Sequence, residues 1–456
     1  MYTQERFLLC FSEGYGKLFL LNAKQVTRMN ETPFTNIRSL LGALAKALNL
    51  INPAVENHHE QTAYFAFFIG RELGFEEEEL HTIVYAALLH DLGSIILEEQ
   101  VSVEEIESNA QEYAHIGAKM IRDLPGFAEI ADVIELCQTD WATLSAWADG
   151  NGSACLRCVR DAAVIHLGDA VSTCLNPNRR ILSQVPRICS FLRQGSGTAF
   201  MPEALDALDR LRDLEVIWLD AANNPGFLMF FTGEFHQITL QKTAELTRLM
   251  SRIIDYRSAF TAMHSAGVAA TSRELARLCG WSAEDCLKME IAGNLHDLGK
   301  LVVPRSILEK PGKLTDEEFS VIREHTYYTR LILMDIEGFD QITDWAGFHH
   351  EKLNGRGYPF HLDRESLDQG SRIMAVADIF SAITEDRPYR AGMPREQVIQ
   401  ILRENVERDA IDGELVELLI AHYDEVDAAR VRLSHEAGSR YYSFLGERPA
   451  WEQAEG

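Results

Sequence analysis

Residues 294–304 read NLHDLGKLVVP, and this stretch decides how the rest of the chain is interpreted. His296, Asp297 and Lys300 stand here inside an otherwise apolar segment. Adjacent His and Asp side chains are costly to bury in an apolar helix unless a partner pairs with them, and a metal ion is the commonest such partner. The stretch therefore predicts a helix that carries metal ligands, and a second polar motif, FHHEKLNGRGYP, follows at 348–359.

The stretch recurs in the first half of the chain. RELGFEEEELHTIVYAALLHDLG at 71–93 can be laid over RLCGWSAEDCLKMEIAGNLHDLG at 277–299. The paired residues are His58 with His264, His90 with His296, and Asp169 with Asp378, at offsets of 206, 206 and 209. Anchors at a nearly constant offset indicate an internal duplication.

Hydrophobic periodicity predicts the fold class. Apolar residues recur at helical spacing through nearly all of both halves, as in LLGALAKALNL, and β alternation is scarce. The predicted fold is all-α, with an N-terminal helical bundle over 1–225 and a C-terminal bundle over 238–456. The break is expected at 220–237, where Asn, Pro and Gly cluster. A short β-hairpin is also expected within residues 7–21, FLLCFSEGYGKLFLL, because its glycines suit a turn.

Composition limits the classes of partner. The 43 Lys and Arg against 69 Asp and Glu give a formal charge of −26, which disfavours DNA, RNA and anionic membranes. No apolar run is long enough to span a membrane, and the start, MYTQERFLLC, lacks the pattern of a signal peptide. The eight Cys residues are then interpreted as reduced thiols, and a cytoplasmic location is expected.

The second half gathers an unusual set of candidate metal ligands. They are His264, His296, Asp297, His325, His349, His350 and Asp378. A single His on an apolar helix face is usually a hydrogen-bonded core residue, but tandem imidazoles rarely serve packing. Seven ligands exceed the need of one ion, so two divalent first-row ions are predicted, iron or manganese first and nickel, cobalt or magnesium next. Two ions that share a carboxylate can activate a bridging hydroxide for attack on phosphorus.

These motifs carry a family resemblance. HSAGVA, LHDLGKLVVPRSILEKPGKLTDEEF, REHT, HHEKLNGRGYP, RIMAVADIFSAIT and DRPYR occur in this order within 264–390. The region resembles the HD-GYP subgroup of the HD metal-dependent phosphohydrolases. The resemblance implies a phosphodiesterase for 3′,5′-linked cyclic dinucleotides, namely cyclic di-GMP or 3′,3′-cyclic GMP-AMP (cGAMP). A degenerate HD domain ahead of an HD-GYP domain is also similar to known cGAMP phosphodiesterases.

The resemblance also implies roles for single residues. One ion would be bound by His264, His296, Asp297 and Asp378. The other would be bound by Asp297, His325, His349 and His350, with Asp297 bridging. Asp297 and Lys300 would be catalytic, and the expected substrate contacts are Lys300, Arg356, Tyr358, Arg387 and Arg390. Tyr358 could stack on a base or merely pack. Phe260 stands where relatives with a third ion carry Glu, so two ions are expected.

The first half is interpreted as a degenerate copy of the second. It keeps His58, His90, Asp91 and Asp169, but Tyr113, Cys137, Gln138 and Ser94 stand where the second half has His325, His349, His350 and Lys300. The remaining ligands could hold one ion, so a structural or regulatory role is expected. A regulatory ligand or partner at this domain and a homodimer both stay open. So do two other functions: an HD hydrolase of another nucleotide, and a non-enzymatic cyclic-dinucleotide sensor.

Overall fold

The structure is a computed structural model, and it describes most of the chain after residue 32. Residues 34–456 form one compact unit. The described residues are 33–51, 57–96, 109–124, 126–151, 156–223, 237–255, 259–308, 310, 312–385 and 392–445. The hairpin expected within residues 7–21 lies outside them.

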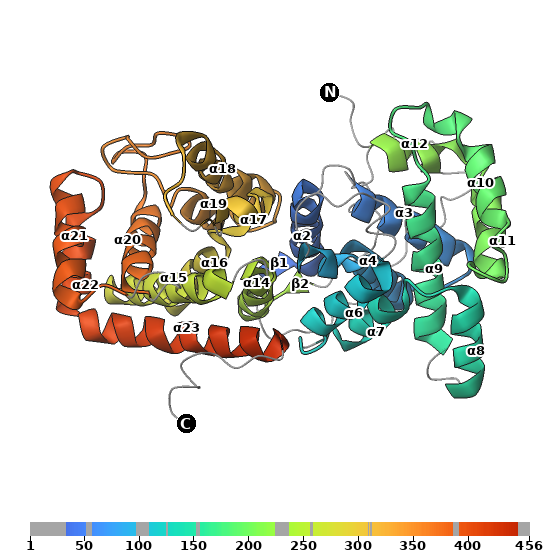
Figure 1. Cartoon of the computed structure of the whole chain (residues 1–456), viewed down its shortest axis with the longest axis horizontal. Coiled ribbons are helices and arrows are strands. Elements are labelled where there is room, and N and C mark those ends of the chain that lie inside the picture. Colours follow the sequence, from blue (N-terminus) through green and yellow to red (C-terminus); the bar gives the residue numbers. More distant parts are fainter. Residues whose placement is uncertain are drawn as a thin grey trace. The chain divides into compact units, whose positions relative to one another are not determined.

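The first half is a helical bundle (Figure 1). Its main helices are α2 (Ile37–Ile51), α3 (His58–Glu72), α4 (Glu77–Leu89), α6 (Ala110–Ile121), α7 (Ala128–Leu136), α8 (Trp141–Asn151), α9 (Leu156–Thr173), α10 (Val185–Arg193), α11 (Pro202–Leu211) and α12 (Glu215–Asn223). The described residues of this half also form two short 3-10 turns, η2 (Leu92–Ile96) and η3 (Ile181–Ser183). Helices α3, α4, α7 and α9 pack together around the first candidate site.

The second half is a bundle of the same kind (Figure 1). Its elements are α14 (Leu240–Asp255), α15 (Ala259–Leu278), α16 (Ala283–Leu295), η5 (Leu298–Val302), α17 (Arg305–Leu308), α18 (Asp316–Leu333), α19 (Asp340–Gly347), α20 (Gln369–Thr384), α21 (Arg395–Glu407), α22 (Gly413–Ala421) and α23 (Tyr423–Leu445). The described ranges contain one small antiparallel ladder, β1 (Thr35–Asn36) with β2 (Gln237–Ile238). The all-α fold class is therefore confirmed.

The internal duplication is visible in the element bounds. Helices α4 and α16 begin and end at positions 206 residues apart, and so do the 3-10 turns η2 and η5. Each turn crosses a later helix at a glycine, η2 against α6 and η5 against α18. A Cβ on Gly93 would lie 2.2 Å from the carbonyl oxygen of Tyr113, and a Cβ on Gly299 would lie 1.9 Å from that of His325. The two crossings are equivalent, so Tyr113 occupies the place of His325, as the sequence predicts.

Helix α2 packs against both halves. It contacts α3, α4 and η2 of the first half, and η5 and α18 of the second. Lys46 on α2 donates to the carbonyl oxygen of Leu331 at 2.8 Å and pairs with Asp335 at 2.6 Å. Next to α2, Asn36 donates to Glu337 at 3.0 Å. The division of the chain into domains 1–225 and 238–456 remains a proposal, and α2 is one of the elements that contact both.

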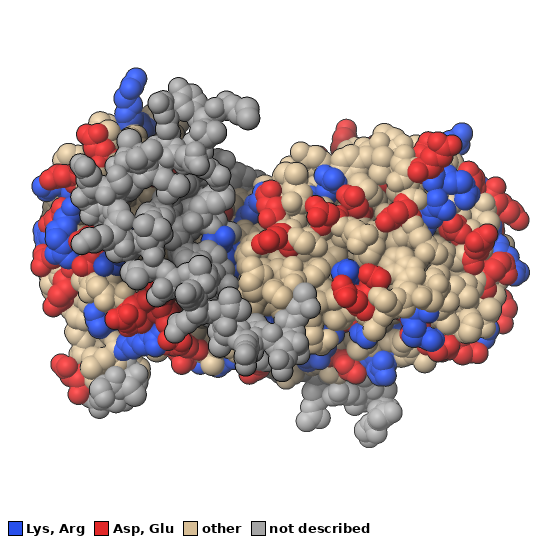
Figure 2. All heavy atoms as spheres, turned by 180° about the vertical axis from the view of Figure 1, so that it is seen from behind, with Lys and Arg blue, Asp and Glu red and all other residues tan. Residues whose placement is uncertain are grey.

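Charges on the surface are mixed. On the face drawn in Figure 2, acidic and basic side chains are interspersed rather than sorted into separate areas. The ion pairs of the described residues include exposed ones such as Arg403 with Glu417 at 3.0 Å and Arg364 with Asp409 at 2.6 Å. Among the described helices, none is long and apolar enough to cross a membrane.

Asp161 on α9 is a buried carboxylate without a hydrogen bond from any described residue. Burial, with repulsion from Glu79, raises its pKa to about 7. The folded state then binds a proton that the unfolded state releases at lower pH, so this group destabilises the fold increasingly as the pH rises from about 4 to 7. We expect Asp161→Asn to raise the melting temperature by a few degrees at pH 8 and by less at pH 5.5.

Thermal melts of Asp161→Asn at the two pH values check this expectation. The exposed Asp149→Asn provides the control and should leave the melting temperature nearly unchanged at both. If Asp161→Asn raised the melting temperature equally at pH 5.5 and pH 8, the raised pKa assigned to Asp161 would be contradicted.

Candidate metal centre

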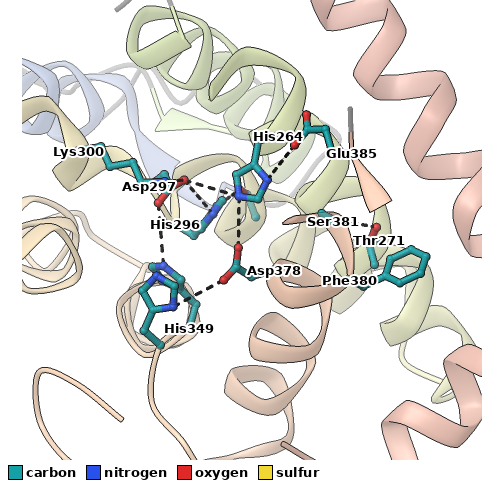
Figure 3. A network of polar contacts seen from close by, with 12 residues as sticks. His264, Thr271, His296, Asp297, Lys300, His349, Asp378, Phe380, Ser381 and Glu385 are labelled. Carbon is teal, nitrogen blue, oxygen red and sulfur yellow. Dashed lines mark hydrogen bonds and ion pairs between the residues drawn. The ribbon is translucent and has the colours of Figure 1, made fainter. Parts of the chain in front are cut away.

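Seven predicted ligand side chains converge at the centre of the second bundle (Figure 3). They come from five places: His264 on α15, His296 and Asp297 between α16 and η5, His325 on α18, His349 and His350 just after α19, and Asp378 on α20. All are buried except His350, whose side chain is 29% exposed. The structure therefore brings together every residue that the sequence predicts as a metal ligand.

Glycines allow the helices that carry these ligands to approach closely. On α16, a Cβ at Gly293 would lie 2.5 Å from the Cα of Ala269, so α16 and α15 cross almost backbone to backbone. Gly299 performs the same function between η5 and α18. Thr329 on α18 secures that crossing, because its hydroxyl accepts the N–H of Gly299 and donates to the carbonyl oxygen of His296, both at 2.9 Å. The His-Asp pair is thereby held against α18.

Three of the histidines are oriented by the backbone. His296, His325 and His349 each direct Nδ1 at the carbonyl oxygen three residues earlier, at 2.7, 2.5 and 2.7 Å. A carbonyl oxygen only accepts, so Nδ1 carries the proton and Nε2 is left with a free lone pair. The Nε2 atoms of His325 and His349 lie 3.2 Å apart. Two acceptors that face each other at this distance require a cation or a proton between them.

Asp297 lies between the two groups of histidines. Its Oδ2 is 3.2 Å from Nε2 of His296, and its Oδ1 is 3.4 Å from Nε2 of His325. Lys300 adds its ammonium group at 2.6 Å from Oδ2. Burial opposes the charge on Asp297, but His296 and Lys300 outweigh it and hold its pKa well below the usual value. An ionised carboxylate is thus available to both groups of ligands.

Asp378 makes the corresponding link on the other side. Its Oδ1 lies 3.2 Å from Nε2 of His264, and its Oδ2 lies 3.6 Å from Nδ1 of His350. Burial opposes the charge on His264, but Asp378 and Glu385 raise its pKa to about 9. Figure 3 shows His264, Asp378 and His349 arranged around a common centre with Asp297.

The donor set fits divalent cations. Burial lowers the pKa of His325 to about 3 and that of His350 to about 4, and it holds the pKa of His349 well below its usual value. These imidazoles are neutral at pH 7 and can donate a lone pair to a metal. Nε2 of His296 and Oδ1 of Asp297 are buried and accept no hydrogen bond from the described residues. Neutral imidazoles beside ionised carboxylates are the ligands that first-row metals prefer.

Lys300, which contacts Asp297, is the predicted substrate contact inside this cluster, and the others that the structure describes lie beside it. The Tyr358 ring packs against His350, with ring centroids 4.9 Å apart, and the guanidinium of Arg323 lies 5.0 Å from the centre of the same ring. Arg356 is exposed on the loop that contains Gly357, Tyr358 and Pro359, here called the GYP loop. Arg387 and Arg390 lie outside the described residues, and so does the side chain of Phe260. In the structure Tyr358 therefore packs against protein side chains, which is one of the two roles expected for it.

The sequence did not predict two buried carboxylates near the ligands. Glu351 accepts the backbone N–H groups of Phe360 at 2.7 Å and Leu362 at 3.0 Å, so it holds the loop that follows the double His. Its position directly after the two histidines was the signal that could have found it. Glu385, just past α20, lies 3.4 Å from Nδ1 of His264. No local motif indicated that contact.

The first half forms a reduced version of the same cluster. Nε2 of His58 lies 3.2 Å from Asp169, Nε2 of His90 lies 3.2 Å from Asp91, and the two Nε2 atoms are 3.3 Å apart. Gln138 donates to Asp169 at 3.0 Å, in the place where His350 faces Asp378. His58, Asp91 and Asp169 line a cavity of about 960 Å³. His115 is not part of the cluster, because it is exposed and pairs with Glu135 at 2.6 Å.

Comparisons with known proteins agree with the two-part organisation. The HD domain family matches residues 55–173, and a second HD domain family matches residues 248–415. The 3′3′-cGAMP-specific phosphodiesterase 1 of Vibrio cholerae is 30% identical over 400 residues, which cover 84% of this chain and 91% of that protein. A cyclic di-GMP phosphodiesterase of Pseudomonas aeruginosa is 40% identical over 146 residues, which cover 32% of this chain and 35% of that protein.

A solved structure shares the fold. The crystal structure of a cyclic GMP-AMP-specific phosphodiesterase of V. cholerae, V-cGAP3, aligns with a TM-score of 0.58 and 24% identity. The alignment covers 86% of this chain and 98% of that one. The similarity therefore includes both bundles and not the second one alone.

Proposed function

Because this chain belongs to the HD-GYP family of cyclic-dinucleotide phosphodiesterases, we propose that its second half hydrolyses a 3′,5′-linked cyclic dinucleotide to the linear dinucleotide. The substrate class is cGAMP, cyclic di-GMP or both. The relative that is similar over both halves is specific for cGAMP, so cGAMP is the first substrate to test. The observation that carries the proposal is the position of Asp297, whose two oxygens face separate histidines within a buried set of seven ligands.

The proposed metal centre has two groups of ligands that share Asp297. One consists of His264, His296, Asp297 and Asp378, and the other of Asp297, His325, His349 and His350. Divalent ions bound there would act as Lewis acids toward the phosphoryl oxygens and would lower the pKa of an attacking water. Iron and manganese are the proposed metals, since imidazole and carboxylate ligands suit both.

The chain's own residues position the substrate. Lys300 is 20% exposed, so its ammonium group lies at the edge of the buried cluster while it contacts Asp297. In this position it can neutralise a phosphoryl oxygen of a bound diester. Arg356 and Tyr358 on the GYP loop are proposed to contact the rest of the dinucleotide. Arg387 and Arg390 are proposed to contact it as well. The planar guanidinium group suits a phosphate.

Turnover of a panel of cyclic dinucleotides by protein reconstituted with defined metals tests the function. Release of a linear dinucleotide from cGAMP or cyclic di-GMP, dependent on iron or manganese, is the expected result. Hydrolysis of mononucleotides instead would favour the HD hydrolase of another substrate. Tight binding of a cyclic dinucleotide without any product, in protein with its full metal content, would favour the non-enzymatic sensor.

We expect Lys300→Ala to lower kcat by about 10²–10³-fold, because a cation directed at the developing charge is lost. Bound metal should remain at the wild-type level, since Lys300 is not in the ligand set. Steady-state kinetics with metal analysis checks both quantities. Lys288→Ala is the matched control, because Lys288 pairs with Glu284 at 2.9 Å on α16 and does not touch the centre. A kcat within twofold of wild type for Lys300→Ala would exclude the assigned role.

The first half is proposed to support or regulate the second. Its cluster lacks the counterparts of the double His and of Lys300, so it is not expected to perform the same hydrolysis. The cavity beside His58 and Asp169 is the proposed position for a regulatory ligand. A homodimer and a cytoplasmic location also remain proposals, which sedimentation and cell fractionation can test.

A further inference from the structure

Glu385 is a buried carboxylate whose polar partner in the structure is a predicted metal ligand. It lies one residue beyond α20, its side chain is 6% exposed, and its Oε2 is 3.4 Å from Nδ1 of His264 (Figure 3). Neither of its oxygens has a hydrogen-bond partner among the described residues, and Nδ1 of His264 has none either, so the contact is an ion pair rather than a hydrogen bond. Burying an ionisable group in this way is costly unless the group is paired, so the contact with His264 requires an explanation.

His264 differs from the other ligand histidines in how its ring is held. His296, His325 and His349 each donate Nδ1–H to a backbone carbonyl oxygen. Nδ1 of His264 makes no hydrogen bond to a described backbone group, and the Glu385 carboxylate occupies that side of the ring. A carboxylate there favours the proton on Nδ1 when Nε2, which is 3.2 Å from Asp378, gives up its own proton to bind a metal.

The first half shows the same histidine with a different partner. His58, the counterpart of His264, contacts the hydroxyl of Ser172 through Nδ1 at 3.1 Å. Ser172 in turn donates to Gln61 at 3.0 Å. A hydroxyl therefore stands in the first half where a carboxylate stands in the second. The internal duplication provides a natural comparison between the two.

The second half has lost that hydroxyl contact for a structural reason. The counterpart of Ser172 is Ser381, at the offset of 209 that relates Asp169 to Asp378, and its hydroxyl lies 3.4 Å from that of Thr271. The counterpart of Gln61 is Gly267, at the offset of 206. A Cβ on Gly267 would lie 2.9 Å from the hydroxyl oxygen of Ser434, so a larger side chain there would crowd the packing of α23 on α15. Ser381 thus lacks the glutamine that holds Ser172.

We propose that Glu385 is a positioning residue of the metal centre, which holds His264 in its metal-binding orientation and strengthens the binding of the ion at His264 and Asp378. A carboxylate on the far nitrogen of a ligand histidine increases the basicity of the ring, and a hydroxyl does so less. This inference rests on the proposed metal centre and adds a partner outside its ligand set. It also distinguishes the two halves, since the first-half histidine has the weaker partner.

Metal affinity of the apo-protein, measured by competition with a chelator, tests the proposal without reference to turnover. Glu385→Gln keeps an acceptor for Nδ1–H but removes the charge, so we expect about tenfold weaker binding of one ion. Glu385→Ala removes both, so the loss should reach about a hundredfold. Both variants should regain the wild-type stoichiometry at saturating metal, because no ligand is removed. The cobalt(II)-substituted Glu385 variants should also differ in their visible spectrum from cobalt(II)-substituted wild type, because Glu385 no longer holds the His264 ring.

Glu290→Gln is the matched control, because Glu290 is a buried carboxylate whose partners are Arg248 and Arg273. It should alter thermal stability and leave metal affinity unchanged. Wild-type affinity in both Glu385 variants, or an equal loss in Glu290→Gln, would overturn the proposal. So would a stoichiometry that stays one ion short at saturating metal, because Glu385 would then be a ligand itself. Failure of the metal centre as a whole would appear separately, as full metal content in a His296→Ala/Asp297→Ala variant.

Discussion

Replacement of Asp297 or His349 by Ala is expected to abolish turnover and to reduce bound metal to one ion or none. Asp297 faces both groups of ligands, with Oδ2 at 3.2 Å from His296 and Oδ1 at 3.4 Å from His325. His349 presents its Nε2 to the same space, 3.2 Å from that of His325. Loss of either side chain removes a ligand and leaves the remaining buried groups without the charge balance that a divalent ion provides.

Metal analysis and product chromatography on each single variant check this result. His115→Ala is the control, because this histidine is exposed, pairs with Glu135 and lies outside the cluster. It should keep full activity and full metal content. If both the Asp297 and the His349 variants retained turnover and two ions, the assignment of a shared carboxylate would have to be abandoned.

Paired substitutions in the two halves should have opposite outcomes. His296→Ala with Asp297→Ala should remove hydrolysis while the protein still folds. His90→Ala with Asp91→Ala should leave most of the hydrolysis, because the first cluster has Cys137 and Gln138 in place of the double His and Ser94 in place of Lys300. Some loss of stability is expected in the first-half variant if an ion binds there, since an ion bound only by the folded state stabilises it.

The measurement is product release by both double variants, with thermal melts to compare their stability. Each variant is the control for the other, because the same two residue types are removed from equivalent places in one chain. Complete loss of activity in the first-half variant, at a stability equal to that of the second-half variant, would make the first cluster catalytic. Its interpretation as a degenerate copy would then be wrong.

The ligand set could be predicted from the sequence because each ligand occurs in a short local motif. His296 and Asp297 are adjacent, His349 and His350 are adjacent, and the helical periodicity around them indicates burial. Helix geometry also explains why His115 is no substitute for His325. Two residues along a helix turn a side chain by about 200°, which places His115 on the opposite face from Tyr113.

The contacts of Glu385 and Glu351 could not be predicted in the same way. Glu385 meets His264 across two helices, α20 and α15, and no spacing rule links residues so far apart in the chain. Glu351 binds backbone N–H groups of a loop, and the course of that loop does not follow from periodicity. The packing of α2 on η5 was missed for a similar reason, since amphipathic pattern shows that a helix is buried but not against which partner.

The packing of α2 has a consequence for the order in which the chain can fold. Residues 34–51 leave the ribosome well before residues 298–339, yet Lys46 bonds to Leu331 and Phe34 packs on Phe339 with ring centroids 6.0 Å apart. At typical rates of synthesis, the delay between the two segments is on the order of tens of seconds. During this delay, one face of α2 lacks η5 and α18, the elements that it packs against in the full chain. A gene fragment that starts at residue 238 would lack α2, and its η5 and α18 would expose to water the surface that α2 covers in the full chain.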